Sequence, residues 1–541
     1  MAWIKAAPLG TLTDRPFVFN HPPRQIAVFS VDGRRYAIDN RCPHEGYPLA
    51  AGTVDEDCVL TCNWHNWKFR LSDGECLIGG DHVRSYRTKA EDGHIWIDVS
   101  DPPKDEIRKE VFRGLRKAFD ERDFGRICRE LARLHFHGID PKEAVVKAIE
   151  WSHDRLEFGT THAMAATADW LALAGTAGRD LEPELICLTE SIDHYAFDSL
   201  RHPACPYPGP ASAPFSADAF HTAVETENRE QAESLIARAL ADGLHWPDVE
   251  EAMAGAALAH YNDFGHSLIY VAKAGQLLEA LGTRAERWVA LPLARSLCYA
   301  FREDLIPEFR EYGPVLDRLP PVGTSRPSAS RPGVPYPMNT PQALGWLAEH
   351  AGTHDAQGLY DALLEALALN MLHFDTRYGE AYDRPVSQNV SWLDFTHGLT
   401  FANAARVLCN RYPRLWPAAL AQMACFLGRS RPFILKDAPS IREDWKVDDS
   451  AGFFAGIRER LLDHGLRDPI FSAHLLKTSM AVEAELAFAS ESCREALLAS
   501  LHRFLASPLK TKHVRRLARQ AIALVARDFA PPPPVSPGPR A

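Results

Sequence analysis

Two short stretches near the N-terminus decide what the first part of the chain folds around: RCPHEGYPLA at residues 41–50 and LTCNWHNWKF, which begins at Leu60. The first stretch carries Cys42 and His44, and the second carries Cys62 and His65. A zinc ion and an iron–sulfur cluster both accept two thiolates and two imidazoles as ligands. Ligand type alone therefore leaves both kinds of site open.

Spacing and context favour the cluster. A zinc finger places its two Cys together and its two His together, with the second pair on a helix. Here each stretch supplies one Cys and one His, which suits a [2Fe-2S] cluster whose two irons take two thiolates and two imidazoles respectively. Both stretches lie in turn-rich sequence of alternating polarity, so we expect two opposed β-loops that close on the cluster.

This pattern resembles the Rieske family, and the resemblance covers nearly all of the first hundred residues. It consists of C-x-H, a spacer of seventeen residues and C-x-x-H, with Gly46-Tyr-Pro48-Leu49 after the first pair and Trp67-Lys-Phe69 after the second. The resemblance implies that Cys42 and Cys62 bind one iron of the cluster, and that His44 and His65 bind the other.

Four positions in these loops refine the expectation. Where the family usually has Pro after the second Cys and Gly after the second His, this chain has Asn63 and Asn66, so we expect a loop of different shape. High-potential members carry an extra Cys in each loop, whereas Tyr47 and Trp64 stand at those positions here. We therefore expect no disulfide staple and a ferredoxin-like potential near the bottom of the roughly −150 to +300 mV Rieske span.

The character of the sequence changes near residue 103. Short alternating runs such as RQIAVFSV and HIWIDV predict strands before it, and helical periodicity rich in Ala and Leu follows it. We predict a small all-β domain over 1–103 and a large all-α domain over 104–525. The Pro-rich stretch 313–341 is predicted to be a linker or a loop, and the tail 526–541 to be disordered.

Composition excludes several classes of protein. The 541 residues carry a net charge of −11 and no long run of Lys or Arg, which argues against a nucleic-acid surface. No apolar run approaches the roughly 18–20 residues that cross a bilayer, and no secretory signal is recognised, so we expect a cytoplasmic protein without a membrane segment. The 11 Cys are odd in number and largely scattered, which argues against a disulfide framework.

The helical part repeats one unusual unit. NDFGHSLIYVAKAGQLLEALG (262–282) and LDFTHGLTFANAARVLCNRYP (393–413) align without gaps, and each places a His shortly after an Asp that could cap a helix. Two further segments place a His after Thr or Ser and before a run of small, apolar residues. Four interior helices are thus predicted to present one His each at the same level of a bundle: His162, His266, His397 and His474.

These segments are similar to the questin oxidase family, and the similarity extends over residues 110–525. That resemblance implies oxidation and ring cleavage of polycyclic aromatic polyketides. It also implies a non-heme iron held by the four His and by a carboxylated lysine, here Lys477, three residues after His474. Members of that family do not normally carry a Rieske domain, so the fusion leaves the source of electrons and the substrate open.

Together these observations predict a Rieske-coupled non-heme iron oxygenase with a [2Fe-2S] cluster and a mononuclear Fe(II). We expect O2 and a small, aromatic or polyketide-like metabolite as substrates, and oxygen insertion or C–C cleavage as the reaction. Because no nucleotide-binding glycine loop is found, a separate ferredoxin or flavin reductase should supply electrons. No catalytic residue beyond the metal ligands is assigned.

Two alternatives stay open at this level. The chain could be a Rieske electron carrier whose helical part is a scaffold with structural His. The helical part could also hold a di-iron centre, although the Glu-x-x-His pairs typical of such bundles are not found near the four His.

Overall fold

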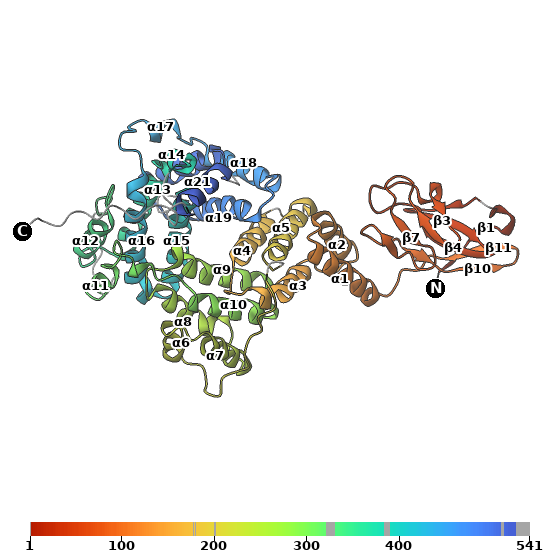
Figure 1. Cartoon of the computed structure of the whole chain (residues 1–541), viewed down its shortest axis with the longest axis horizontal. Coiled ribbons are helices and arrows are strands. Elements are labelled where there is room, and N and C mark those ends of the chain that lie inside the picture. Colours follow the sequence, from red (N-terminus) through yellow and green to blue (C-terminus); the bar gives the residue numbers. More distant parts are fainter. Residues whose placement is uncertain are drawn as a thin grey trace, which may run out of the picture. The chain divides into compact units, whose positions relative to one another are not determined.

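The computed structural model describes residues 2–13, 15–176, 178, 180–199, 202–320, 331–383, 390–509 and 513–525. The chain divides into two compact units, Met1–Pro141 and Lys142–Ala541, which we call the β unit and the helical unit. Within the described residues every strand precedes residue 99, and helices make up the regular structure that follows (Figure 1). The predicted fold class, a small β domain followed by a large helical region, is confirmed.

The β unit is longer than the predicted domain of 103 residues. It also includes α1 (Lys104–Glu121) and α2 (Phe124–Phe136). Asp81 has no exposed surface, and its carboxylate accepts hydrogen bonds from Arg129 Nε at 2.7 Å and Arg133 Nη1 at 2.9 Å. Buried charges require such partners, so these bonds tie α2 to the β structure.

The strands of the β unit form three antiparallel sheets, with the orders β1-β11-β10, β2-β3-β4-β9 and β5-β6-β7-β8. Their bounds are β1 Trp3–Pro8, β2 Phe17–His21, β3 Arg24–Val31, β4 Arg34–Asp39, β5 Thr53–Val54, β6 Val59–Thr61, β7 Lys68–Arg70, β8 Cys76–Ile78, β9 Ser85–Tyr86, β10 Thr88–Glu91 and β11 His94–Asp98.

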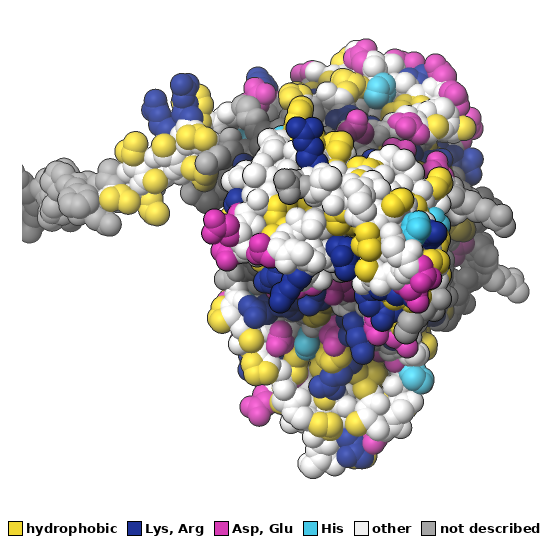
Figure 2. Space-filling model, turned by 90° about the vertical axis from the view of Figure 1, so that its right-hand side faces the viewer, with side chains coloured by type: hydrophobic (Ala, Val, Ile, Leu, Met, Phe, Trp, Pro, Cys, Tyr) yellow, Lys and Arg dark blue, Asp and Glu magenta, His cyan; other side chains and the backbone are white. Residues whose placement is uncertain are grey.

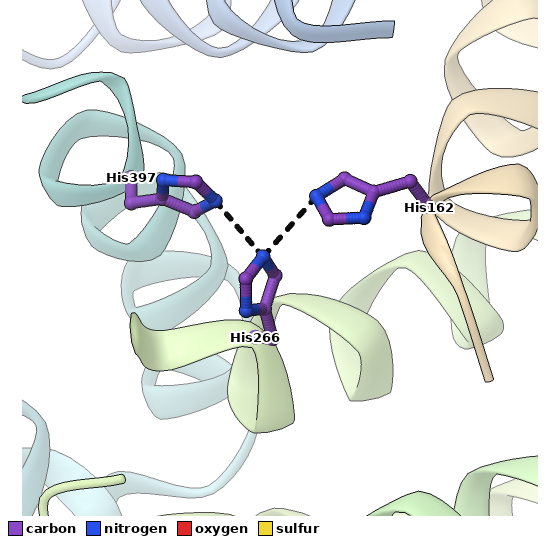
Figure 3. Close-up of side chains that lie close together, drawn as sticks. All are labelled: His162, His266 and His397. Atoms are coloured by element: carbon purple, nitrogen blue, oxygen red, sulfur yellow. Dashed lines mark hydrogen bonds between the residues drawn. The ribbon is translucent and has the colours of Figure 1, made fainter. Parts of the chain in front are cut away.

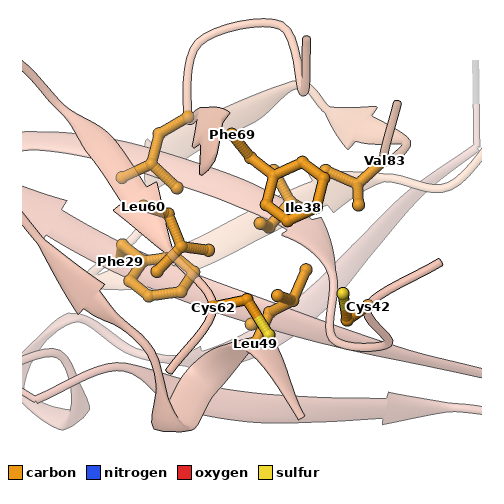
Figure 4. Packing of buried hydrophobic residues seen from close by; sticks show 10 residues of the cluster. Phe29, Ile38, Cys42, Leu49, Leu60, Cys62, Phe69 and Val83 are labelled. Atoms are coloured by element: carbon orange, nitrogen blue, oxygen red, sulfur yellow. The ribbon is translucent and has the colours of Figure 1, made fainter. Parts of the chain in front are cut away.

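Strand β3 joins the two hydrophobic cores of the β unit because both of its faces are buried. Successive side chains of a strand point to opposite faces. Ile26 and Val28 therefore pack into one core, while Ala27 and Phe29 pack into the other. The second core also contains Cys42 and Cys62 (Figure 4), so packing places both thiols against the sheet.

The remaining helices belong to the helical unit. They are α3 Lys142–Ser152, α4 His162–Thr176, α5 Leu181–Ser199, α6 Ala217–Glu225, α7 Arg229–Ala241, α8 Trp246–Leu258, α9 His266–Leu281, α10 Glu286–Cys298, α11 Tyr312–Leu316, α12 Thr340–His350, α13 Ala356–Leu372, α14 Arg377–Glu380, α15 Trp392–Arg411, α16 Trp416–Ser430, α17 Ile441–Asp444, α18 Ser450–Leu462, α19 Pro469–Leu486, α20 Glu491–Ala506 and α21 Val514–Val525.

Four helices that are far apart in the sequence form a closed ring in the helical unit. Helix α4 packs against α9, α9 against α15, α15 against α19, and α19 against α4. Small side chains such as Ala163, Ala166 and Ala274 are fully or nearly fully buried on these helices, which lets the backbones approach closely. Each of these helices carries one of the four predicted His.

Some predictions fall partly or wholly outside the described residues. Within the Pro-rich stretch 313–341, α11 ends at Leu316 and α12 begins at Thr340, and residues 321–330 lie outside the description. The tail 526–541 also lies outside it. Among the described helices, none has both the length and the apolarity needed to cross a membrane. On the face drawn in Figure 2, Lys and Arg are interspersed with Asp and Glu.

Candidate metal centres

The two Cys-His loops of the β unit share one backbone design. In the first loop, Cys42 N donates to Tyr47 O at 2.9 Å; in the second, Cys62 N donates to Trp67 O at 2.7 Å. A second bond in each loop runs back to the Cys carbonyl, from Gly46 N at 2.8 Å and from Asn66 N at 2.9 Å. Each loop is thus a tight turn that presents a Cys and a His from a fixed backbone.

Asn66 stands where the Rieske family usually has Gly, and the backbone of the second loop nevertheless keeps the same turn as the first. Gly46 has a φ of 80°, in the left-handed region that favours glycine, and Asn66 takes the corresponding position with a φ of 63°. Asn tolerates this conformation better than most other residues because its short side chain can bond locally. The expected difference in loop shape is therefore not seen at this residue.

The four predicted cluster ligands come together at one end of the β unit. Cys42 and Cys62 are buried, with 2% and 1% of their surface exposed, and burial raises the pKa of the Cys42 thiol to about 11. The imidazoles lie on the outer side, where Nδ1 of His44 is 3.0 Å from Nδ1 of His65. Two inner thiols and two outer imidazoles fit a [2Fe-2S] cluster with one sulfur-ligated and one nitrogen-ligated iron.

Aromatic rings surround the two imidazoles. Trp67 stacks on His44 with 4.8 Å between ring centroids, and the Trp64 ring lies 5.6 Å from that of His65. Tyr47 and Trp64, which stand where a disulfide staple would require two Cys, stack on each other at 5.5 Å. Trp64 is 60% exposed, so this end of the β unit presents an aromatic side chain to solvent beside the imidazole pair.

In the helical unit, the ring of four helices brings the four predicted His together. His162 lies on α4, His266 on α9 and His397 on α15, and their side chains point toward one another in Figure 3. His266 Nε2 is 3.2 Å from His162 Nε2 and 2.9 Å from His397 Nε2. The ring of His474 on α19 completes the group, with centroids 5.0 Å from His162 and 5.1 Å from His397.

The predicted caps of these helices are partly wrong. Helix α15 begins one turn earlier than Asp394 would place it: Ser391 is the N-cap, and Asp394 accepts a bond from Ser391 N in a capping box. His397 therefore lies in the second turn. Asp263 precedes α9 in a left-handed turn with Phe264 and Gly265, and Gly265 is the N-cap.

Backbone carbonyls fix the orientation of three of the four imidazoles. Nδ1 of His266 lies 2.7 Å from Asp263 O, and Nδ1 of His474 lies 2.7 Å from Ile470 O. Nδ1 of His397 makes the same kind of contact at 2.5 Å, with the carbonyl four residues earlier. A carbonyl can only accept, so each Nδ1 carries the proton and each Nε2 is a bare acceptor. This arrangement is the one by which proteins orient metal-binding His.

The bare Nε2 atoms form a set of acceptors that suits a cation. A hydrogen bond between Nε2 of His266 and Nε2 of His397 would require a further proton on one ring. Burial lowers the pKa of all four imidazoles, and the nearby Lys477 lowers it further, in the case of His266 to about 3. The rings are therefore neutral near pH 7. His474 Nε2 is buried with no partner among the described residues. Four neutral imidazoles that converge in this way fit a divalent transition metal.

Lys477 lies beside this group, as its position on α19 predicts. Its side chain is 1% exposed, and its Nζ has no hydrogen-bond partner among the described residues. Burial lowers its pKa from 10.5 to about 7. A buried lysine that loses its proton near pH 7 can act as a nucleophile or a ligand, whereas an ammonium ion cannot.

The predicted site did not include three buried polar residues on the helices that carry His162 and His266. Tyr270 Oη lies 3.3 Å from His162 Nδ1, in the place that a carbonyl takes for the other rings. Lys273 Nζ donates to Asp169 Oδ1 at 2.6 Å, and both residues are buried. Asp169 and Lys273 each follow their helix's His by seven residues, two turns along the same face. That spacing of polar residues on otherwise apolar helices is the signal that could have found them.

Comparisons with known proteins identify the N-terminal part of the chain. The Rieske [2Fe-2S] domain family matches residues 2–86. The 3-phenylpropionate/cinnamic acid dioxygenase ferredoxin subunit of Photorhabdus laumondii is 33% identical over 78 residues, which are 14% of this chain and 74% of that protein. Its counterpart from Escherichia coli K12 is 36% identical over 76 residues, 14% of this chain and 72% of that protein.

One solved structure covers a small part of the chain. The ferredoxin of carbazole 1,9a-dioxygenase from Nocardioides aromaticivorans IC177 is 22% identical, covers 18% of this chain and 100% of its own, and has a TM-score of 0.18. The curated relatives show the family for less than a fifth of the chain, and the helical unit lies beyond what they cover. Through its N-terminal domain, the chain belongs to the Rieske [2Fe-2S] family.

Proposed function

We propose that the chain is an O2-dependent oxidoreductase in which the Rieske domain supplies electrons to a mononuclear non-heme iron in the helical unit. The observation that carries this proposal is the convergence of four neutral imidazoles whose Nδ1 atoms already have partners. A structural His on a helix needs one hydrogen bond, but nothing in packing requires three bare Nε2 atoms and a fourth imidazole to face each other in a buried site.

The residues divide into two sets of ligands. Cys42, Cys62, His44 and His65 would hold the [2Fe-2S] cluster, and His162, His266, His397 and His474 would hold Fe(II). When bound, the cluster would pass single electrons and the iron would activate O2 for oxygen insertion or C–C cleavage. The helices hold the imidazoles within reach of one metal ion, and burial keeps them unprotonated and excludes bulk water.

Lys477 is proposed as a further ligand after carboxylation by CO2. In this step the neutral amine of Lys477 forms a new N–C bond to CO2, and the nitrogen releases one proton to leave an anionic carbamate. The step requires an unprotonated Nζ, and the lowered pKa of Lys477 supports it. The resemblance of residues 110–525 to the questin oxidase family motivates the assignment. A carbamate would also compensate the charge of the metal in a site that otherwise has only neutral ligands.

The proposed reaction partners follow from what the chain carries. The substrate would be a small aromatic or polyketide-like metabolite of secondary metabolism, and a separate ferredoxin or flavin reductase would reduce the cluster in the cytoplasm. We propose residues 1–103 as the Rieske domain and 104–525 as the oxygenase domain, although α1 and α2 pack with the former.

An electron-transfer protein with a non-catalytic helical scaffold is the second candidate. It is favoured by the relatives themselves, which are named as ferredoxin subunits and match only the N-terminal part of this chain. In that case the four His would bind no redox metal, and the chain would reduce a partner without consuming O2.

Nitric oxide distinguishes the two candidates, because it gives mononuclear ferrous sites a high-spin EPR signal that a Rieske cluster does not give. We expect this signal from the anaerobic, iron-loaded full chain and its loss in His397→Ala. His350→Ala is the matched control, since His350 Nδ1 also contacts the carbonyl four residues earlier, at 2.8 Å, but lies outside the group. Retention of the signal in His397→Ala would overturn the proposed site.

A further inference from the structure

A second feature of the helical unit is a pocket of about 330 Å³ beside the first turns of α15 and α19. Volumes of roughly 300–1,000 Å³ are typical of small-molecule sites. Its lining includes Leu393 at the start of α15, Phe471 at the start of α19, Gly379 of α14 and Arg516 of α21. All of these residues belong to the helical unit.

Three aromatic rings line one side of the pocket. Phe374 and Trp392 are 1% and 6% exposed, and their rings pack edge-to-face with centroids 5.0 Å apart. Phe471 adds the third ring. Rings packed in this way form rigid apolar walls that suit a flat aromatic ligand, because faces and edges of aromatic rings attract each other.

The pocket lies one helical turn from two of the four His. Leu393 precedes His397 by four residues, and its carbonyl is the one that His397 Nδ1 contacts. Phe471 precedes His474 by three residues on α19. Residues three and four apart on a helix share a face, so the same faces of α15 and α19 line the pocket and carry the two imidazoles.

One polar group in the lining of the pocket is a buried cation. Arg516 is 6% exposed, and its Nε and Nη2 donate to Ala381 O at 2.6 Å and Tyr378 O at 2.5 Å. Neither acceptor is charged, and no described carboxylate forms an ion pair with this guanidinium. Asp394, whose charge raises the pKa of Arg516, accepts hydrogen bonds from Ser391 instead.

A buried charge without a counter-ion is costly, and such charges are normally paired. Burial lowers the pKa of Arg516, and that of Arg503 as well. Arg503 stands over the Trp392 ring at 5.4 Å, and its Nη1 donates to a backbone carbonyl. Arg516 in the lining and Arg503 against the Trp392 ring therefore bring two guanidinium groups to the pocket. Glu380 also lines the pocket but is exposed to solvent.

We propose that this pocket binds the substrate of the iron site, and that the substrate is a flat aromatic carboxylate whose ring lies among Phe374, Trp392 and Phe471 and whose carboxylate pairs with Arg516. That the bound molecule is the substrate rests on the proposed function, whereas its binding to the pocket does not require iron. Arg516 is the specificity-determining residue of the site, and the aromatic walls place the ring beside the turns that carry His397 and His474.

The test uses the iron-free full chain and two probes that differ in charge, 2-naphthoate and 2-naphthalenemethanol, with binding followed by probe fluorescence. Arg516→Gln is expected to weaken 2-naphthoate by roughly 10- to 100-fold, the value of a charge-assisted hydrogen bond, and 2-naphthalenemethanol by less than about twofold. Arg519→Gln on the same helix is the control, because Arg519 is exposed and stacks on Tyr382.

A second variant fills the pocket without touching Arg516. A Cβ on Gly379 would meet its nearest atoms at 3.8 and 3.9 Å, so Gly379→Leu adds volume without a backbone clash, and we expect it to weaken both probes at least tenfold. Gly345→Leu on α12, where a Cβ meets nothing within 4 Å, is its control.

Failure of 2-naphthoate to bind at about 1 mM, or equal affinity in the wild type and Arg516→Gln, would overturn the pocket assignment. Because iron is absent, neither result bears on whether the four His bind a metal.

Discussion

Replacing Lys477 with Met is expected to stabilise the iron-free protein, which is unusual for a change in the middle of a buried helix. Met has a similar length and no charge, so it fills the same space. The wild-type Nζ is buried without a hydrogen-bond partner among the described residues, and burial lowers its pKa from 10.5 to about 7. Folding therefore expels a proton from Lys477 or buries its charge at a cost.

The size and pH dependence of this cost follow from the two pKa values. Each step of one in pKa corresponds to about 1.4 kcal/mol, so the full cost is about 5 kcal/mol. It is present below pH 7, where Lys477 is protonated in both the folded and the unfolded state. Between about pH 7 and pH 10.5 only the unfolded state holds the proton, so the stability of the wild type rises with pH.

We expect Lys477→Met to exceed the wild type by about 4 kcal/mol in free energy of unfolding at pH 7, and by about 1 kcal/mol at pH 10. Urea titrations of both proteins, iron-free and in CO2-free buffer, measure the difference. Lys273→Met is the matched control and should be destabilised by about 3–5 kcal/mol, because it leaves Asp169 buried without its ion pair. Equal stability of Lys477→Met and wild type at pH 7 would refute a neutral, poorly solvated Lys477.

Three further outcomes follow from individual contacts. Asn66→Gly should keep the Rieske EPR signal and the thermal stability of the wild type. Asn66→Val should lower the free energy of unfolding by about 1–2 kcal/mol, because the φ of 63° at residue 66 disfavours branched side chains. Equal melting temperatures of the two variants would count against the loop geometry. Tyr270→Phe should weaken iron binding by roughly 10- to 100-fold, measured by titration with Fe(II), since it removes the partner of His162 Nδ1; unchanged affinity would show that Tyr270 only packs. Hydrogen bonds from Ser100 and other donors lower the pKa of Asp98 below its ordinary value of 3.8. The ionised carboxylate therefore stabilises the β unit above pH 3.8, and this contribution to the free energy of unfolding is lost as the pH falls further. Asp98→Asn should flatten the acid limb of the curve of stability against pH, and an unchanged limb would contradict this.

The class of fold could be predicted because each unit has its own periodicity. Short alternating runs indicate the strands of the β unit, and the helices beyond residue 103 appear as runs of Ala and Leu with a period near 3.6. The inclusion of α1 and α2 in the first unit could not be predicted, because it depends on Asp81 meeting Arg129 and Arg133 from a different element. Such long-range ion pairs leave no local pattern.

The four His could be singled out because the same short unit recurs, and the structure places their rings together. What the sequence could not provide is the role of each ring nitrogen, since that depends on which carbonyl lies within reach of Nδ1. The starts of α9 and α15 also differ from the prediction, because Gly265 and Ser391 are the N-cap residues and the nearby Asp residues are not. The pocket beside α15 and α19 is assembled from segments more than a hundred residues apart, so no spacing reveals it.

The most direct test of the whole account is the content of iron and acid-labile sulfide per chain in anaerobically purified protein, with EPR of the reduced sample. A Rieske cluster alone accounts for about two iron and two sulfide. Our account predicts about three iron and two sulfide, with the third iron lost in His397→Ala while the Rieske signal remains. Two iron and two sulfide, unchanged after addition of Fe(II), would contradict it and leave the chain as an electron carrier with a helical scaffold.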